Sequence, residues 1–218
     1  AELDKFVEEA RFILTYWCEH SNVPVTFWDR TRGDATEAVD TDDPFAAFEV
    51  EEATASGPEQ VNHPLHAETD VSIRIARDDT EAVVGIANQP LYGYYNGGLT
   101  LLRTGNADAL GRFAEKLQRL SFKVKNDALE HTLTRDNVLQ DDHWERVMEI
   151  VLEGRLQLVQ ALIDACVRAV EAGEDPEVWQ QHLAVLCEED DVQAIVLKNA
   201  GKPLFRSGTG EPLTLDAE

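Results

Sequence analysis

The chain of 218 residues is 43% hydrophobic, which is enough to build a packed core and excludes an intrinsically disordered protein. Its 42 acidic residues against 19 basic ones give a formal net charge of -23, which repels nucleic acids and anionic membranes. We therefore expect no direct binding to nucleic acid. The charge favours a basic protein as partner, for example a nucleic-acid-binding protein, but general solubility and a salt-adapted host are alternative explanations.

The cysteines and the hydropathy bear on the compartment. Cys18, Cys166 and Cys187 are widely spaced and form no Cys-x-x-Cys pair, which is typical of small core residues in a reducing environment. The N-terminus is charged, and no uninterrupted apolar run approaches the roughly 18 residues of a membrane span. The sequence therefore predicts a cytoplasmic protein without a membrane segment.

The N-terminal half predicts one helix followed by strands. Phe6, Ile13 and Trp17 recur at helical spacing, which predicts a helix over residues 3–20. The patterns typical of strands follow at 23–28, 69–76, 82–87, 91–95 and 99–102. Asn96-Gly97-Gly98 is expected to turn the last two into a hairpin. Residues 30–66 form an acidic, loop-like insertion with a strand candidate at 45–50, and an insertion of this length is either mobile or functional.

The C-terminal half predicts a long helix between shorter elements. Asn106 is a good cap for a helix over 107–120, and a hairpin is expected over 121–138 with its turn at Asn126-Asp127. The apolar period then predicts a helix over 142–172, with Asp142 and Glu145 as a capping box and Gly173 as its stop. Further predicted elements are a short helix over 175–186, strands at 192–197 and 203–205, and a frayed tail.

These elements predict an α+β fold in which an antiparallel sheet of about five or six strands is packed by helices. Residues 1–173 are expected to form one domain that contains the acidic insertion 30–66. Residues 174–218 are expected to form a C-terminal extension with a short helix and a candidate hairpin.

Two groups of side chains are candidates for contact with other proteins. The tyrosines Tyr92, Tyr94 and Tyr95 are candidates for a partner surface, because exposed tyrosines are enriched at interfaces. The alternative is a strand with one buried and one exposed face. A homodimer interface is expected on the second helix and the strand after it, and the alternative is that these side chains belong to the core. The candidate dimer residues are Leu110, Phe113, Leu117 and Phe122.

The best metal candidate in the sequence is a pair of histidines, His63 and His66, followed by Glu68 and Asp70. Imidazole and carboxylate are ligands that zinc prefers, but Pro64 prevents the regular helix that would pair the histidines, and the spacing matches no recognised zinc site. We therefore predict an ordinary exposed loop and no metal site, and we keep a metal- or ligand-dependent enzyme that uses the His63/His66 loop as the alternative.

Other catalytic patterns are weak. Cys18 lies near His20, but Cys18 and Cys166 both fall within predicted helices, so core packing is the favoured interpretation. The carboxylate clusters at 78–81 and 188–191 lack the pattern of a calcium loop. The sequence contains no P-loop, no G-x-G-x-x-G motif and no G-x-S-x-G motif. We expect no catalytic residues, no cofactor and no enzymatic activity.

The order of helices and strands over residues 3–172 resembles the YbjN family, whose fold is similar to that of type III secretion chaperones. The pattern is helix, three antiparallel strands, helix, two strands, helix. The most family-like stretch is 113–139, where Leu117-Gln118-Arg119-Leu120 runs into Ser121-Phe122-Lys123-Val124 and then into Leu133-Thr134-Arg135-Asp136-Asn137-Val138-Leu139. The insertion 30–66 and the tail 174–218 lie outside the pattern. The resemblance implies a small acidic, dimeric, non-enzymatic protein that holds or stabilises another protein.

The sequence as a whole thus predicts a homodimeric adaptor or chaperone-like protein that binds a protein client. Apolar grooves would supply affinity, and the negative field would raise the encounter rate with a basic client. The alternatives are the enzyme described above and a salt-adapted protein whose acidity is unrelated to partners.

Overall fold

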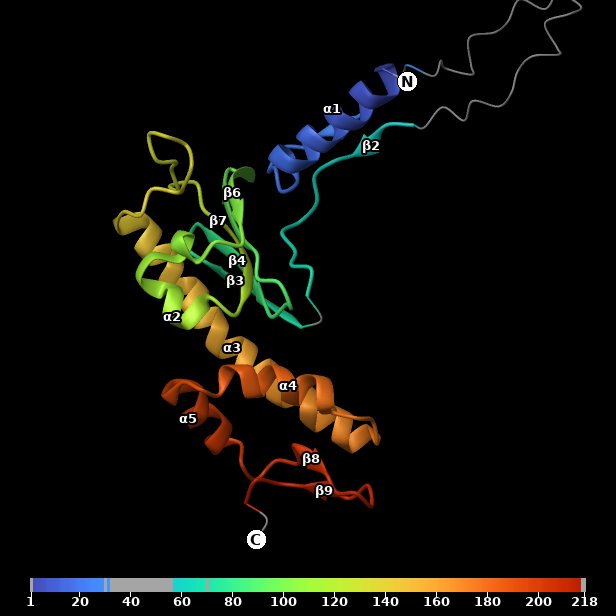
Figure 1. The fold of residues 1–218 in the computed structure, drawn as a ribbon, viewed down its shortest axis with the longest axis vertical. Helices are drawn as coiled ribbons and strands as arrows, with labels where there is room; N and C mark the ends of the chain where they lie inside the picture. Colours follow the sequence, from blue (N-terminus) through green and yellow to red (C-terminus); the bar gives the residue numbers. More distant parts are fainter. Residues whose placement is uncertain (1, 30, 32–56, 70, 217–218) are drawn as a thin grey trace, which may run out of the picture. The chain divides into compact units, whose positions relative to one another are not determined.

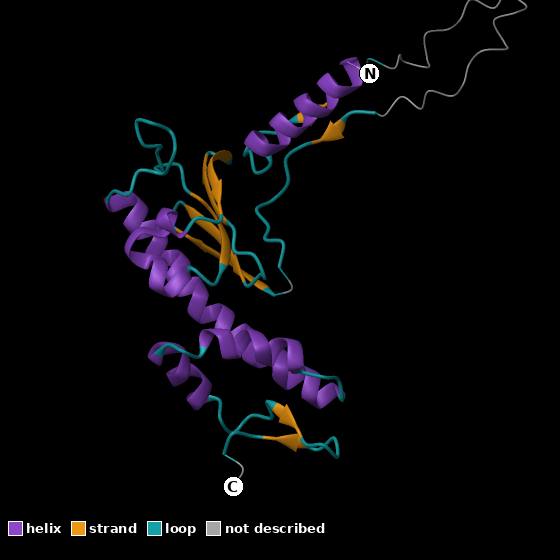
Figure 2. Cartoon of the chain, viewed as in Figure 1, coloured by secondary structure: helices purple, strands orange, loops and turns teal. Residues whose placement is uncertain are grey.

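The computed structural model describes residues 2–29, 31, 57–69 and 71–216 (Figure 1). Most of the acidic insertion, with the strand candidate at 45–50, lies outside these residues. The chain divides into a first unit, Ala1–Pro64 with Gly98–Thr100, and a second unit, Leu65–Gly97 with Leu101–Glu218. Helices accompany a five-stranded sheet, which confirms the predicted α+β class (Figure 2).

The first unit consists of one helix and a short ribbon. The helix α1 spans Glu2–Cys18, close to the predicted range. Strand β1, Thr26–Phe27, pairs antiparallel with β2, Glu59–Gln60. Asn62 fixes the connection, because its Oδ1 accepts a hydrogen bond from Val25 N at 2.8 Å and its Nδ2 donates to Ser21 O at 3.0 Å. The ribbon is shorter than the predicted strand at 23–28.

The second unit contains the main sheet, apart from the first two residues of β6, and the strand order is β3-β4-β7-β5-β6. Strand β4 is antiparallel to both β3 and β7, but β5 is parallel to β7. The sheet is therefore mixed, and the prediction of an antiparallel sheet was wrong on this point. The strands are β3 Ser72–Arg77, β4 Thr80–Gly85, β5 Tyr92–Asn96, β6 Leu99–Thr104 and β7 Ser121–Lys125.

The parallel pair arises from the connection between β6 and β7. Strands β5 and β6 are joined at Gly97 and Gly98, which both have positive φ as the predicted turn requires. The chain then crosses over through η2, Ala107–Phe113, and α2, Ala114–Leu117, before it returns as β7. A helical crossover is the usual way to place a parallel neighbour.

Two predicted elements of this region take another form. The single helix expected over 107–120 is a 3-10 helix and a short α-helix, because Gly111 interrupts it with φ 48° and ψ -131°. The hairpin expected over 121–138 forms only its first strand, β7. The remainder is a loop closed by one bridge between His131 and Val138, and Arg135 turns it with a positive φ.

Helix α3 spans Asp142–Ala172, as predicted. Its cap is Asp141 rather than the expected Asp142, since Asp141 Oδ1 accepts hydrogen bonds from His143 N and Trp144 N at 3.0 and 2.9 Å. Gly173 ends the helix in the left-handed conformation, with φ 80°. The helix packs on β3 and β4 and also on the C-terminal helices.

The C-terminal segment contains two helices and a small ribbon. Helix α4 spans Glu177–Leu186, and α5 spans Asp190–Lys198, where a strand was predicted over 192–197. Val192, Ile195 and Val196 follow helical spacing and pack against the core, which favours the helix. The ribbon pairs β8, Phe205–Arg206, with β9, Pro212–Leu213, so the predicted strands at 192–197 and 203–205 do not pair as a hairpin.

Among the described helices, none has the length and apolar character required to span a lipid bilayer.

Gly154 on α3 offers a test of how closely this helix packs on the sheet. A Cβ at Gly154 would lie 2.8 Å from Val84 Cγ2 and 3.2 Å from Ile75 Cδ1. We expect Gly154→Leu to lower the free energy of unfolding by roughly 1–3 kcal/mol, because the added atoms overpack the interface. Urea unfolding followed by circular dichroism measures this. Gly208→Leu is the control, since nothing lies within 4 Å of a Cβ there; equal effects of the two changes would contradict the expectation.

Candidate functional site on helix α1

Helix α1 exposes an aligned set of large apolar side chains. Leu3, Phe6, Ile13 and Trp17 are spaced so that they share one side of the helix, and they are 55%, 65%, 53% and 45% exposed. We call these four residues the α1 apolar face. No described residue of α1 is buried. The helix is therefore amphipathic, and the described side chains of its apolar side are exposed.

A third exposed aromatic residue of α1, Phe12, widens this surface. Phe12 is 70% exposed and stacks on Tyr16, with ring centroids 6.5 Å apart. Together with Glu8, Glu9 and Ile13 it lines a shallow hollow of about 350 Å³. The hollow therefore joins Phe12 to the α1 apolar face through Ile13, and it has two carboxylates at its border.

The opposite side of α1 holds the helix on the β1–β2 ribbon. The Arg11 guanidinium lies over the Phe27 ring, 5.5 Å from its centroid, and pairs with Glu59 at 3.4 Å. Arg11 is displaced around the helix axis from the α1 apolar face, so this anchoring leaves the face open.

The C-terminal end of α1 is fixed by buried polar groups. Glu19 and His20 are buried, and Glu19 O accepts a hydrogen bond from His63 N at 2.7 Å. His20 Nδ1 lies 3.2 Å from His63 O, within hydrogen-bond distance. A Cβ at Gly98 would lie 1.9 Å from His20 O, so this close approach requires glycine. These contacts make the end of the helix a defined position and not a frayed terminus.

The charges on α1 are predominantly negative. Its acidic residues are Glu2, Asp4, Glu8 and Glu9, and its basic residues are Lys5 and Arg11. Both cations are paired with glutamates: Lys5 lies 3.6 Å from Glu9, and Arg11 pairs with Glu59. The field around the α1 apolar face is therefore negative and favours a cationic partner.

The histidine loop has the exposed character that the sequence predicted. His63 and His66 are both exposed, and no helix or strand forms between residues 61 and 69. Asp70, the last of the candidate ligands, lies outside the described residues. The enzyme alternative based on this loop stays a hypothesis.

The predicted tyrosine surface lies inside the second unit. Tyr92, Tyr94 and Tyr95 are buried. The hydroxyl of Tyr94 donates to Ala109 O at 2.7 Å, that of Tyr92 donates to Gln118 O at 2.9 Å, and burial raises the pKa of both phenols. In the folded structure these side chains are core residues, so the interpretation as a partner surface was wrong.

The four candidate dimer residues are also core residues. Phe113 packs edge-on against Trp144, with ring centroids 5.6 Å apart, and Phe122 packs against Tyr92 and Tyr94. The alternative that these side chains form the domain's own core is supported, because η2, α2 and β7 contribute them to one buried hydrophobic cluster. The buried candidates are Leu110, Phe113, Leu117 and Phe122.

Two of the three cysteines have a raised pKa. Cys18, Cys166 and Cys187 are all free. Burial raises the pKa of Cys166 to about 11 and also raises that of Cys187, which disfavours the nucleophilic thiolate. Cys166 belongs to the buried core and Cys187 packs against it, which agrees with their interpretation as packing residues, whereas Cys18 is half-buried on α1 and lies outside this core.

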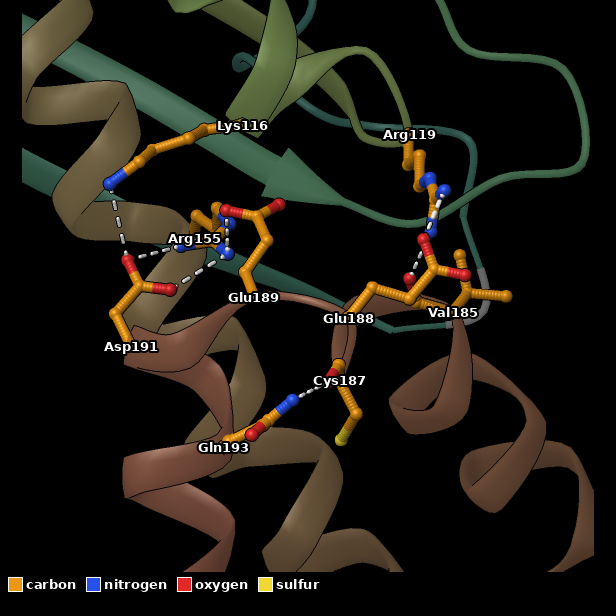
Figure 3. A network of polar contacts seen from close by, with 9 residues as sticks. All are labelled: Lys116, Arg119, Arg155, Val185, Cys187, Glu188, Glu189, Asp191 and Gln193. Atoms are coloured by element: carbon orange, nitrogen blue, oxygen red, sulfur yellow. Dashed lines mark hydrogen bonds and ion pairs between the residues drawn. The ribbon is translucent and has the colours of Figure 1, made fainter.

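A polar network joins α3 to the acidic segment between α4 and α5 (Figure 3). The fully buried Arg155 side chain contacts Glu189 at 2.7 Å and makes two hydrogen bonds to Asp191, at 3.0 and 3.2 Å. Lys116 lies 3.5 Å from the same Asp191 carboxylate, and Arg119 donates to Val185 O at 2.6 Å. Part of the carboxylate cluster at 188–191 is thus ion-paired, and these ion pairs hold the C-terminal helices on α3.

The chain matches no protein-family model and no curated protein.

The network predicts a pH-dependent contribution to stability. The hydrogen bonds from Arg155 hold the pKa of Asp191 below its usual range. Its contribution is therefore present above about pH 4, the unfolded value, and is lost as the pH falls through the folded value. We expect Asp191→Asn to reduce the free energy of unfolding at pH 7 and to have a much smaller effect at acid pH.

Chemical unfolding at several pH values measures this difference. Asp190→Asn is the matched control, because Asp190 is the exposed neighbouring carboxylate. A constant effect of Asp191→Asn across the pH range would contradict the ion-pair explanation.

Proposed function

We propose that the protein is a non-enzymatic adaptor or chaperone-like protein that binds a basic protein client through the α1 apolar face. The observation that carries this proposal is the alignment of four large apolar side chains, each 45–65% exposed, on one helix. Scattered exposed hydrophobic residues are normal, but a contiguous apolar surface marks an interaction site. An amphipathic helix that presents such a surface is a common mode of protein recognition.

Charge selects the kind of client. The net charge is -23, and the cations of α1 are already paired within the first unit. A complementary segment would be an amphipathic helix with an apolar stripe flanked by lysine or arginine, as in many nucleic-acid-binding proteins. Opposite charge raises the association rate and disfavours acidic competitors. A second copy of this chain carries the same charge, so repulsion opposes the homodimer predicted from the sequence.

Two further sequence interpretations accompany the proposal. The resemblance to the YbjN family rests on the order of elements and is consistent with a client-binding role. The free cysteines favour a reducing compartment such as the cytoplasm.

Binding of designed peptides tests the proposal. We expect a labelled peptide with a leucine stripe flanked by lysines to bind the protein, and a peptide with the same stripe flanked by glutamates to bind much more weakly. The double change Phe6→Ser and Ile13→Ser should weaken binding of the cationic peptide at least tenfold, because it removes the centre of the α1 apolar face. Fluorescence anisotropy measures each affinity.

The matched control replaces two exposed apolar residues outside α1, Leu133 and Leu197, by serine. This control should leave peptide binding unchanged. Unaltered binding by the α1 variant, or equal binding of both peptides, would refute the proposal. A wild-type dimer in analytical ultracentrifugation that dissociates in the α1 variant would identify a second copy as the occupant instead.

Salt tests the electrostatic part separately. Raising the ionic strength from about 0.1 M to about 1 M shortens the screening length from about 10 Å to about 3 Å. We expect weaker peptide binding at high salt, mainly through slower association, in stopped-flow measurements. An affinity independent of salt would remove charge from the proposal and leave only the apolar contact.

A further inference from the structure

The hollow beside Phe12 on α1 combines an aromatic ring with carboxylates. Its lining consists of Glu8, Glu9, Phe12 and Ile13, and its volume is about 350 Å³. Glu8 and Glu9 precede Phe12 by four and three residues, so one turn of the helix brings both carboxylates to the N-terminal side of the ring. All four residues belong to one helix of the first unit, so the hollow is a local property of α1.

The first unit shows how this chain completes a similar combination of ring and carboxylate. The Arg11 guanidinium lies over the Phe27 ring, 5.5 Å from its centroid, and pairs with Glu59 at 3.4 Å. A guanidinium is planar and keeps its charge, so it can stack on an aromatic ring while its N–H groups donate to a carboxylate. The complete arrangement therefore consists of an arginine, an aromatic ring and a glutamate.

The same arrangement occurs in the second unit. The Arg112 guanidinium lies 5.0 Å from the centroid of the Phe113 ring, and Arg112 pairs with Glu145 at 3.0 Å. Here the arginine and the ring are adjacent in sequence, whereas Arg11 and Phe27 come from different elements. The combination is therefore not the product of one local sequence, and the chain uses it in two structural settings.

The hollow on α1 has the ring and the carboxylates but no arginine from the described part of the chain. Phe12 is 70% exposed, and no described arginine lies over its ring. Glu8 forms no ion pair with a described residue. Glu9 pairs with Lys5 at 3.6 Å, but both side chains are more than half exposed, so this pair is weak. The hollow therefore offers a binding surface for a guanidinium from another molecule.

We infer that an arginine of the protein client packs on Phe12 in this hollow and donates hydrogen bonds to Glu8 and Glu9. The inference rests on the proposed function for the identity of the partner as a basic protein, and it names arginine as the residue that is recognised. A lysine would pair with the carboxylates as a point charge, but it lacks the planar group that stacks on a ring. Because Ile13 belongs to both the hollow and the α1 apolar face, the arginine would flank the apolar stripe of the client.

Two versions of the leucine-stripe peptide, flanked by arginines or by lysines, test the choice of cation by fluorescence anisotropy. The full chain should bind the arginine version roughly two- to fivefold more tightly, as expected for a guanidinium on an exposed ring. Phe12→Leu keeps an apolar side chain without the ring and should abolish this preference. Glu8→Gln should weaken binding of the arginine peptide more than Glu2→Gln, which removes an exposed carboxylate of α1 outside the hollow. Equal binding of the two peptides, or a preference that Phe12→Leu retains, would overturn the inference and leave the proposed function standing.

Tetra-arginine, which contains no apolar residue, tests the hollow independently of the α1 apolar face. In NMR titrations of the full chain, we expect tetra-arginine to shift the backbone amide resonances of residues 8–13 more than tetralysine at the same concentration. Phe12→Leu should remove this difference, and the variant should fold because the side chain is exposed. This result without binding of either leucine-stripe peptide would refute the proposed function but support the arginine site. Equal shifts with the two peptides, or shifts only outside residues 8–13, would overturn the inference.

Discussion

Two neighbouring residues of α3 determine how the second unit is assembled. Gly154 lets the helix approach the sheet, because any side chain there would meet Val84 and Ile75. Arg155, the next residue, points to the C-terminal segment and pairs with Glu189 and Asp191. A single helix thus serves as the packing partner of the sheet and also of α4 and α5.

The Arg155 network specifies position more than it adds stability. A buried ion pair regains in attraction about what it loses in desolvation, so apolar residues of similar volume often stabilise a protein as well. Here the described part of the chain provides no hydrogen-bond partner for the buried Arg155 Nε, which is a further cost. The network fixes the position of the acidic segment, because the guanidinium contacts Glu189 and both carboxylate oxygens of Asp191.

The elements with an uninterrupted period could be predicted from the sequence. Helix α3 follows the 3.6-residue period from end to end and stops at a glycine, so its bounds were predicted correctly. The segment 192–197 is short and β-branched, and such a run does not distinguish a strand from a buried helix. The position of β7 between β4 and β5 depends on pairing between distant strands, which no local pattern contains.

The candidate site shows the same limit of local sequence patterns. The periodicity of Phe6, Ile13 and Trp17 predicted that they share a helix face, but periodicity does not say whether anything covers that face. Phe12 lies outside the predicted apolar stripe. Its position was the sequence signal that α1 carries apolar side chains on more than the one side that a core would cover. The prediction that the tyrosines form a partner surface was wrong for the opposite reason. Tyr94 and Tyr95 point to opposite faces of β5, and both are buried because both faces of the sheet are covered there.

The strand order has a consequence for the chain during synthesis. Strands β3 to β6 leave the ribosome before β7, yet β7 is the strand that lies between β4 and β5. Until residues 121–125 emerge, β4 and β5 lack the strand that lies between them in the folded sheet, so their edges are open to pairing with a wrong partner. Strand β7 therefore completes the sheet by inserting between β4 and β5, and not by pairing with an edge strand. The interval before β7 is synthesised is therefore a stage at which the nascent chain can assemble its sheet incorrectly.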